Sequence, residues 1–149
     1  MTEELFKPRM NHVAMSVEDD WLDEARRDEI VDFYSEVFDW ARVDSGESSN
    51  PLVMMTQEWG DFVYIYPSKD GEYMRTPHLD HYGFRVATLA ELEETLDRAK
   101  KRAASDDRVS IIDKDVRPFP TSTLTSCYIG FLLPLMVELQ HYDRHTQTA

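Results

Sequence analysis

Three residues of this 149-residue chain have side chains that could hold a metal ion together: His12, His81 and Glu138. The two histidines occupy the third position of two similar segments, residues 10–17 (MNHVAMSV) and 79–86 (LDHYGFRV). Glu138 lies in a third strand-like segment near the C-terminus. Two imidazoles and one carboxylate on separate strands can bind a divalent cation and leave coordination positions open for a substrate.

Strand alternation predicts that these three side chains share one face of a sheet. Successive side chains of a strand point to opposite faces, and the neighbours of each candidate ligand are mostly apolar. We expect the apolar faces to meet helices and the polar faces to line the concave side of a strongly curved sheet. The polar face carries the three candidate ligands together with Ala14, Ser16, Gly83, Arg85, Gln140 and Tyr142.

Each histidine also has a simpler explanation, because a single histidine in a strand is usually hydrogen-bonded inside the core. Glu138 argues against that explanation for the set. Burying a carboxylate without a partner is unfavourable, and a bound cation removes the cost. We therefore interpret His12, His81 and Glu138 as metal ligands.

The elements that must position these residues occur twice along the chain. A helix is predicted within residues 21–40 and another over residues 88–103, where Thr88 and Glu91 form a capping box. The strand-like stretches that follow the two helices are residues 41–44, 51–56 and 62–66 in the first half and residues 109–113, 124–132 and 136–142 in the second. The order of strand, helix and three strands, repeated with an offset of about 70 residues, predicts two similar modules, residues 10–67 and 78–143.

Length and composition favour a single domain, residues 1–149, built from these two modules. The net charge of −13 makes nucleic acid and anionic membrane surfaces unfavourable partners. No apolar run reaches the length of a membrane span. The single cysteine, Cys127, cannot form an internal disulfide, and the first ten residues do not resemble a signal peptide. We therefore expect a cytoplasmic protein.

The order of these motifs resembles the vicinal oxygen chelate superfamily, which includes glyoxalase I, extradiol dioxygenases, fosfomycin-resistance enzymes and bleomycin-binding proteins. The motifs are NHVAMSV at residues 11–17, FYSEVFDW at 33–40, HYGFRV at 81–86 and VELQ at 137–140. The resemblance covers residues 10–143. It implies an α+β fold in which two βαβββ modules form a curved mixed sheet that cups a metal.

The resemblance also points to a fourth position near the metal. Members similar to glyoxalase I use four protein ligands, and the fourth falls on Tyr64 here. Two histidines and one glutamate without that fourth ligand are similar to the site of extradiol dioxygenases, which hold Fe(II) with positions open for a catecholate and oxygen. This favours Fe2+ as the cofactor, with Mn2+, Ni2+ and Zn2+ as alternatives. Tyr64 is then either a packing residue or an acid, hydrogen-bond donor or weak ligand near the metal.

Arg85 shares the predicted face of His81, where it either binds a substrate carboxylate or forms a salt bridge with a surface acid. We predict a metal-dependent enzyme for a small molecule with adjacent oxygens, with ring-cleaving oxygenation as the leading reaction and with Tyr64 and Arg85 as its catalytic candidates. The alternatives are a glyoxalase-like lyase or isomerase and a metal-free drug-binding protein of the bleomycin-resistance type. Exposed sheet edges favour a homodimer, with the site built either within one chain or across two.

Overall fold

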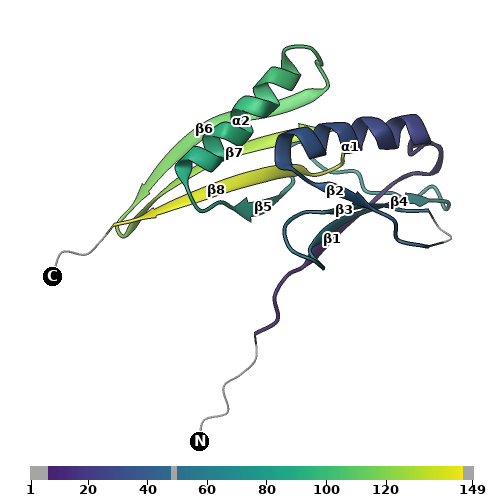
Figure 1. Cartoon of the computed structure of the whole chain (residues 1–149), viewed down its shortest axis with the longest axis horizontal. Coiled ribbons are helices and arrows are strands. Elements are labelled where there is room, and N and C mark those ends of the chain that lie inside the picture. The colour runs from purple at the N-terminus through teal and green to yellow at the C-terminus, as the bar shows by residue number, and fades with distance from the viewer. Residues whose placement is uncertain (1–6, 48–49, 146–149) are drawn as a thin grey trace, which may run out of the picture.

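The computed structural model describes residues 7–47 and 50–145 and contains two βαβββ modules, as predicted. The elements of the first module are β1 (His12–Glu18), the 3-10 helix η1 (Asp19–Trp21), α1 (Glu24–Phe38), β2 (Ala41–Val43), β3 (Leu52–Met55) and β4 (Phe62–Ser68). Those of the second are β5 (His81–Arg85), α2 (Leu89–Ala103), β6 (Val109–Phe119), β7 (Ser122–Phe131) and β8 (Met136–Arg144). Figure 1 shows the modules next to each other, with both helices on the same side.

Each module forms a four-stranded mixed sheet, and the two sheets have the same strand order. The orders are β1-β4-β3-β2 and β5-β8-β7-β6. In each sheet the first strand pairs in parallel with the last, and the other pairs are antiparallel. His12 and His81 therefore each begin an edge strand whose single neighbour is the last strand of the module.

The helix ends follow from local chemistry. Asp23 caps α1 by accepting a hydrogen bond from the backbone N–H of Arg26, and Asp39 ends the helix in the left-handed region, at a φ of 61°. Thr88 and Glu91 form the predicted capping box of α2. No helix in the described part of the chain combines the length and the apolar character that crossing a membrane requires.

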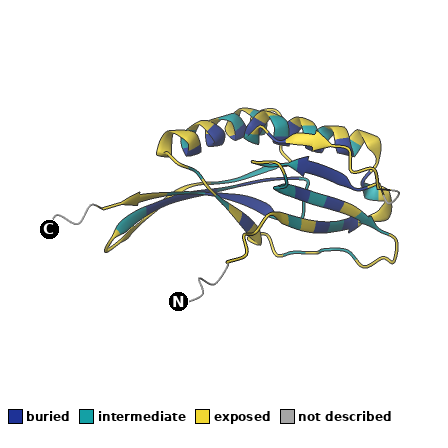
Figure 2. Cartoon of the chain, turned by 60° about the horizontal axis from the view of Figure 1, so that its bottom comes forward, coloured by how far each residue is buried: buried dark blue, intermediate teal, exposed yellow. Residues whose placement is uncertain are grey.

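The helices cover one face of both sheets and share one hydrophobic core, visible as the buried layer beneath them in Figure 2. The fully buried Tyr34 of α1 donates a hydrogen bond to the carbonyl of Phe131 in β7, at 3.1 Å. On the outer side, Arg102 of α2 donates to the carboxylates of Asp32 and Glu36 in α1. Contacts between the modules are therefore concentrated on the helical side.

The predicted alternation of the strands is present in the structure. In β1, Met15 and Val17 are buried against the helices, whereas His12 is exposed. In β5, Tyr82 is buried, whereas His81 and its neighbours of like parity are exposed. The polar faces therefore point away from the helices and are open in a single chain.

Strand β6 extends six residues beyond the stretch predicted from the sequence. Residues 113–119 are exposed, and residues 115–119 pair only with β7, after a register shift between Ile112 and Asp115. Charges, a proline and an irregular register are typical of an edge strand protected from pairing with another chain. These residues have low strand propensity, which hid the second half of β6 in the sequence.

Candidate metal centre

His81 and Glu138 face each other on the polar side of the second sheet. Nε2 of His81 is 3.3 Å from Oε2 of Glu138. The His81 side chain is 36% exposed, whereas that of Glu138 is only 8% exposed. A cation can therefore approach the imidazole from solvent while the carboxylate stays mostly shielded from water.

The tautomer of His81 follows from its second contact. Nδ1 is 2.7 Å from the carbonyl oxygen of Leu79, and a carbonyl can only accept, so Nδ1 carries the hydrogen. When the ring is neutral, the lone pair of Nε2 points toward the Glu138 carboxylate. Two acceptors this close repel unless a proton or a metal ion binds both. Two atoms bonded at about 2.1 Å to one ion, at about 90–110°, are about 3.0–3.4 Å apart, so this pair fits two ligands of one metal.

The Glu138 carboxylate is held in place by its neighbours. Gln140 donates a hydrogen bond from Nε2 to Oε2 of Glu138 at 2.9 Å, and Tyr142 donates to the amide oxygen of Gln140 at 3.3 Å. Gly83 lies opposite Glu138 on β5, where a β-carbon would be 3.5 Å from Oε2. A side chain larger than alanine there would displace the carboxylate. Such neighbours orient a metal-binding carboxylate.

Tyr128 of β7 completes the surroundings of the pair. It lies opposite Glu138 in the sheet, and its ring meets the His81 ring edge-on, with centroids 4.9 Å apart. Burial, and then its hydrogen bond to the Glu138 carboxylate, raise the pKa of Tyr128. Its hydroxyl therefore stays protonated near neutral pH and can donate to Glu138 or to a ligand beside it.

His12 is not part of this group in a single chain. Its ring is exposed, stacks on Phe62 at 4.8 Å between centroids and has Nδ1 2.9 Å from the side-chain oxygen of Asn11. Within the described ranges, no three side chains of His, Cys, Asp or Glu gather as a metal-binding group. One chain thus brings together two of the three predicted ligands and keeps the third apart.

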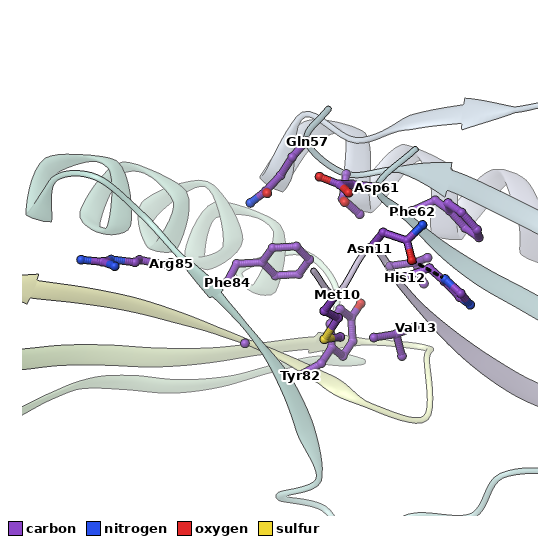
Figure 3. A pocket seen from close by; sticks show the side chains of 13 residues that line it. Met10, Asn11, His12, Val13, Gln57, Asp61, Phe62, Tyr82, Phe84 and Arg85 are labelled. Atoms are coloured by element: carbon purple, nitrogen blue, oxygen red, sulfur yellow. Dashed lines mark hydrogen bonds between the residues drawn. The ribbon is translucent and has the colours of Figure 1, made fainter. Parts of the chain in front are cut away.

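A cavity of about 250 Å³ lies between the two modules, lined by the beginnings of β1 and β4 and by β5. Figure 3 shows Phe84 and Tyr82 on the side of the second module and His12 beyond Asn11, with Arg85 at the opposite end. The buried Tyr82 hydroxyl has no hydrogen-bond partner in the described part of the chain. Burial raises the pKa of Tyr82 well above its ordinary value, so this hydroxyl stays protonated.

Tyr64 occupies the position in the first module that Glu138 occupies in the second. Ala14, two residues after His12, pairs with Tyr64, and Gly83, two residues after His81, pairs with Glu138. The Tyr64 hydroxyl donates to the Glu47 carboxylate at 2.7 Å. The first module therefore has a phenol where the second has a carboxylate.

Arg85 lies on the same face of β5 as His81. Its guanidinium is 5.8 Å from the centroid of the Tyr142 ring. Among residues 7–47 and 50–145 it forms no ion pair, so the salt bridge considered for it is absent there.

The architecture matches known structures although the sequence matches little. No protein-family model matches the chain, and neither does any curated protein. The fosfomycin resistance protein FosX from Listeria monocytogenes is similar, with a TM-score of 0.61 and 18% identity over 95% of this chain and 97% of that one. A glyoxalase/bleomycin resistance protein/dioxygenase from Alicyclobacillus acidocaldarius has a TM-score of 0.60 and 15% identity over 90% and 91%. An integron cassette protein from V. cholerae has a TM-score of 0.58 and 13% identity over 93% and 98%.

The chain has the vicinal oxygen chelate fold. At these identities the likeness is one of fold, and the site has to be argued from its own residues. Within that fold, sequence reasoning placed His81 and Glu138 together and selected Gln140 and Tyr142 as their neighbours. It missed Tyr128, because the antiparallel register of β7 against β8 cannot be read from the alternation of either strand alone.

Proposed function

We propose that this protein is a metal-dependent enzyme for small molecules with two adjacent oxygen donors. The observation that carries the proposal is the His81–Glu138 pair, in which Nε2 of the imidazole faces a shielded carboxylate oxygen at 3.3 Å while Nδ1 is held by a backbone carbonyl. Its metal would be held by this pair and by His12. A bound divalent ion would supply Lewis-acid chemistry to both substrate oxygens.

His12 would reach the pair from a second copy of the chain. One chain keeps His12 apart from the pair, and the polar faces of both modules are open. Both β1 and β5 are edge strands, and an isologous dimer would place one polar face against another. We therefore propose a homodimer with two equivalent sites, each built from both copies.

Ring-cleaving oxygenation of a catechol is the reaction that this ligand set favours. Three protein ligands leave positions for two catechol oxygens and for dioxygen, which is the reason to favour Fe2+ over Mn2+, Ni2+ or Zn2+. Tyr128 would donate a hydrogen bond at the site, and Tyr64 would approach the substrate without adding a carboxylate to the metal. Glyoxalase-like isomerisation is the second candidate, because the fourth protein ligand of such a site would be a carboxylate and Tyr64 stands at its position.

Two observations set the remaining parts of the proposal. Burial raises the pKa of the single cysteine, Cys127, to about 11. A buried thiol that stays protonated is consistent with our proposal that the protein is cytoplasmic. The acidic chain, with its net charge of −13, favours a small-molecule substrate over nucleic acid or an anionic membrane.

Metal analysis is the first test. Protein purified without chelators or a histidine tag is expected to contain close to one divalent ion per chain, and Glu138→Gln is expected to lose most of it. Wild-type protein that takes up no divalent ion, even after anaerobic loading with Fe2+ or Mn2+, would refute the proposal.

Mixing two variants tests whether the site is shared between copies. His12→Ala and His81→Ala are each expected to bind little metal. If sites are shared, random exchange of the two variants restores one site in each mixed dimer, about one quarter of the wild-type content. A site within one chain gives no recovery on mixing. Light scattering at tens of micromolar should give twice the 17.4 kDa mass of one chain.

The reaction is tested with anaerobically iron-loaded protein. A panel of catechols with oxygen is expected to give oxygen uptake and yellow ring-cleavage products, whereas methylglyoxal with a thiol should give little isomerisation. Fosfomycin belongs in the same panel, because a protein of similar fold is named for resistance to it. Turnover of the thiol adduct with Ni2+ or Zn2+, and silence with catechols, would favour the glyoxalase-like alternative. Tight binding of a drug by metal-free protein would favour the third alternative, a drug-binding protein of the bleomycin-resistance type.

A further inference from the structure

Two arginines border one hollow on the polar face of the second sheet. The hollow has a volume of about 270 Å³ and is lined by Arg85, Thr121, Ser122, Tyr142 and Arg144. Apart from the two guanidinium groups, all the side chains lining it carry hydroxyls, and none is a carboxylate. In a chain with a net charge of −13, a hollow with this composition is unusual.

Neither arginine is neutralised by a neighbouring acid. In the described part of the chain, neither Arg85 nor Arg144 forms an ion pair, whereas the arginines of both helices are paired with carboxylates. The acids of the neighbouring strand positions have other contacts. Glu138, on the same row of β8, contacts Gln140 and His81. Asp115 is bound by Arg117, and Asp143 has the opposite parity to Arg144 on β8, so its side chain belongs to the other face.

The sheet itself brings these side chains together. Ser122 pairs with Arg144 across β7 and β8, and Arg85 pairs with Gln140 across β5 and β8. Tyr142 lies between these two pairs on β8, and the Arg85 guanidinium is 5.8 Å from the centroid of its ring. A cation held against an aromatic face keeps its N–H groups at the ring edge, where they can bind an oxyanion through two hydrogen bonds.

The hollow lies beside the candidate metal centre, on the same row of side chains. Glu138, Gln140, Tyr142 and Arg144 alternate along one face of β8. At about 3.3 Å per residue, the backbone positions of Gln140 and Tyr142 are about 7 and 13 Å from that of Glu138. An oxyanion bound by Arg85 would thus be separated from the metal by several atoms.

We infer that Arg85 and Arg144 form an oxyanion-binding subsite for the far end of the substrate. The inference rests on the proposed function for the position of the metal, and it names the substrate class: two adjacent oxygens at one end and a carboxylate or phosphate-type group about 7–13 Å away. Compact molecules such as methylglyoxal cannot span the two points. Tyr142 supports the Arg85 guanidinium, and Ser122 and Thr121 supply hydroxyl donors.

The chain offers a matched control for Arg85. Arg75 also lies over a tyrosine ring, that of Tyr73, at 4.6 Å, and in the described ranges it too forms no ion pair with a carboxylate. It lies in the segment between the modules, away from the hollow. Arg75→Gln therefore removes one charge and one cation–π contact without touching the proposed subsite.

The first test measures binding of inorganic phosphate to the full chain by calorimetry at low ionic strength. Arg85→Gln and Arg144→Gln are each expected to weaken phosphate binding at least fivefold, whereas Arg75→Gln should change it less than twofold. Mn2+ affinity should be unchanged in Arg85→Gln. Wild-type protein without measurable phosphate binding, or equal losses in all three variants, would overturn the inference.

The second test measures the span between the two points. On Mn2+-loaded protein, 3-(3,4-dihydroxyphenyl)propanoate is expected to bind at least tenfold more tightly than 4-propylcatechol, and Arg85→Gln should abolish the difference. Equal binding of the two compounds to wild-type protein would overturn the inference. If wild-type protein binds phosphate through both arginines but binds no metal, the proposed function fails and the subsite stands. If metal binds and the arginine variants bind phosphate normally, the subsite alone fails.

Discussion

Replacing Gln140 with leucine tests whether the hydrogen bond to Glu138 prepares that carboxylate for a metal. The amide N–H donates to Oε2 at 2.9 Å, and the acceptor is only 8% exposed, so water can replace the lost donor only poorly. Removing such a partner of a metal-binding group typically weakens metal binding about 10- to 100-fold, or about 1.4–2.8 kcal/mol. That range agrees with the net value of a hydrogen bond to a charged group, about 1.5–3 kcal/mol.

Mn2+ affinity, measured by calorimetry, is the readout, and thermal unfolding checks that the variant is folded. Tyr142→Phe is the matched control, because it removes the neighbouring hydrogen bond, from Tyr142 to Gln140, which joins exposed groups at 3.3 Å. Its effect should be below about threefold, in line with the small value of exposed polar contacts. Wild-type affinity in Gln140→Leu, together with loss of binding in Glu138→Gln, would refute the reasoning that Gln140 positions the carboxylate.

Three further predictions concern the core and the helix caps. Tyr34→Phe removes the hydroxyl donor to the carbonyl of Phe131, which keeps the backbone N–H of Leu133 as a second donor, and should cost about 1 kcal/mol, lowering the melting temperature by roughly 2–4 °C; an unchanged melting temperature would mean that this link between the modules contributes nothing. Thr88→Ala removes the acceptor for the backbone N–H of Glu91 and should destabilise the protein by about 1 kcal/mol in urea unfolding, with Thr88→Ser as the neutral control. Cys127 should react with a thiol reagent at pH 8 only after denaturation, because its pKa is raised to about 11, and rapid reaction of the native protein would contradict this. The stability gained from the neutral thiol is present below the ordinary pKa of cysteine and is lost as the pH rises through the pKa of Cys127 in the folded protein.

The repeated pattern of alternation was sufficient to predict both modules and the orientation of His81 and Glu138. In a strand of a sheet that has helices on one face and is open on the other, polar and apolar residues must separate onto opposite faces, so parity alone selects the residues that line the open side. The capping box of Thr88 and Glu91 could also be predicted, because both residues interact within one turn of the helix. That residues 1–149 form one domain stays a prediction.

Long-range geometry was not available from the same pattern. The position of Tyr128 opposite Glu138 depends on the length of the turn between β7 and β8. Arg27 of α1 is 2% exposed and donates hydrogen bonds to the carbonyls of Leu22 and Asn50. The helical pattern cannot predict this burial, because both partners lie outside the helix. The separation of His12 from the pair depends on how two modules pack, which neither module encodes alone.

The phenol of Tyr64, at the position equivalent to Glu138, has a consequence for the charge balance of a metal-bound site. Two neutral imidazoles and a single carboxylate leave a divalent ion with one unit of positive charge, whereas a carboxylate at position 64 would cancel it. The remaining charge would be neutralised by an anionic substrate, so metal and substrate would each raise the affinity of the other by the same factor. Such reciprocal coupling lets the protein hold its ion loosely until substrate arrives. Introducing a carboxylate with Tyr64→Glu would then tighten the metal and weaken the substrate together.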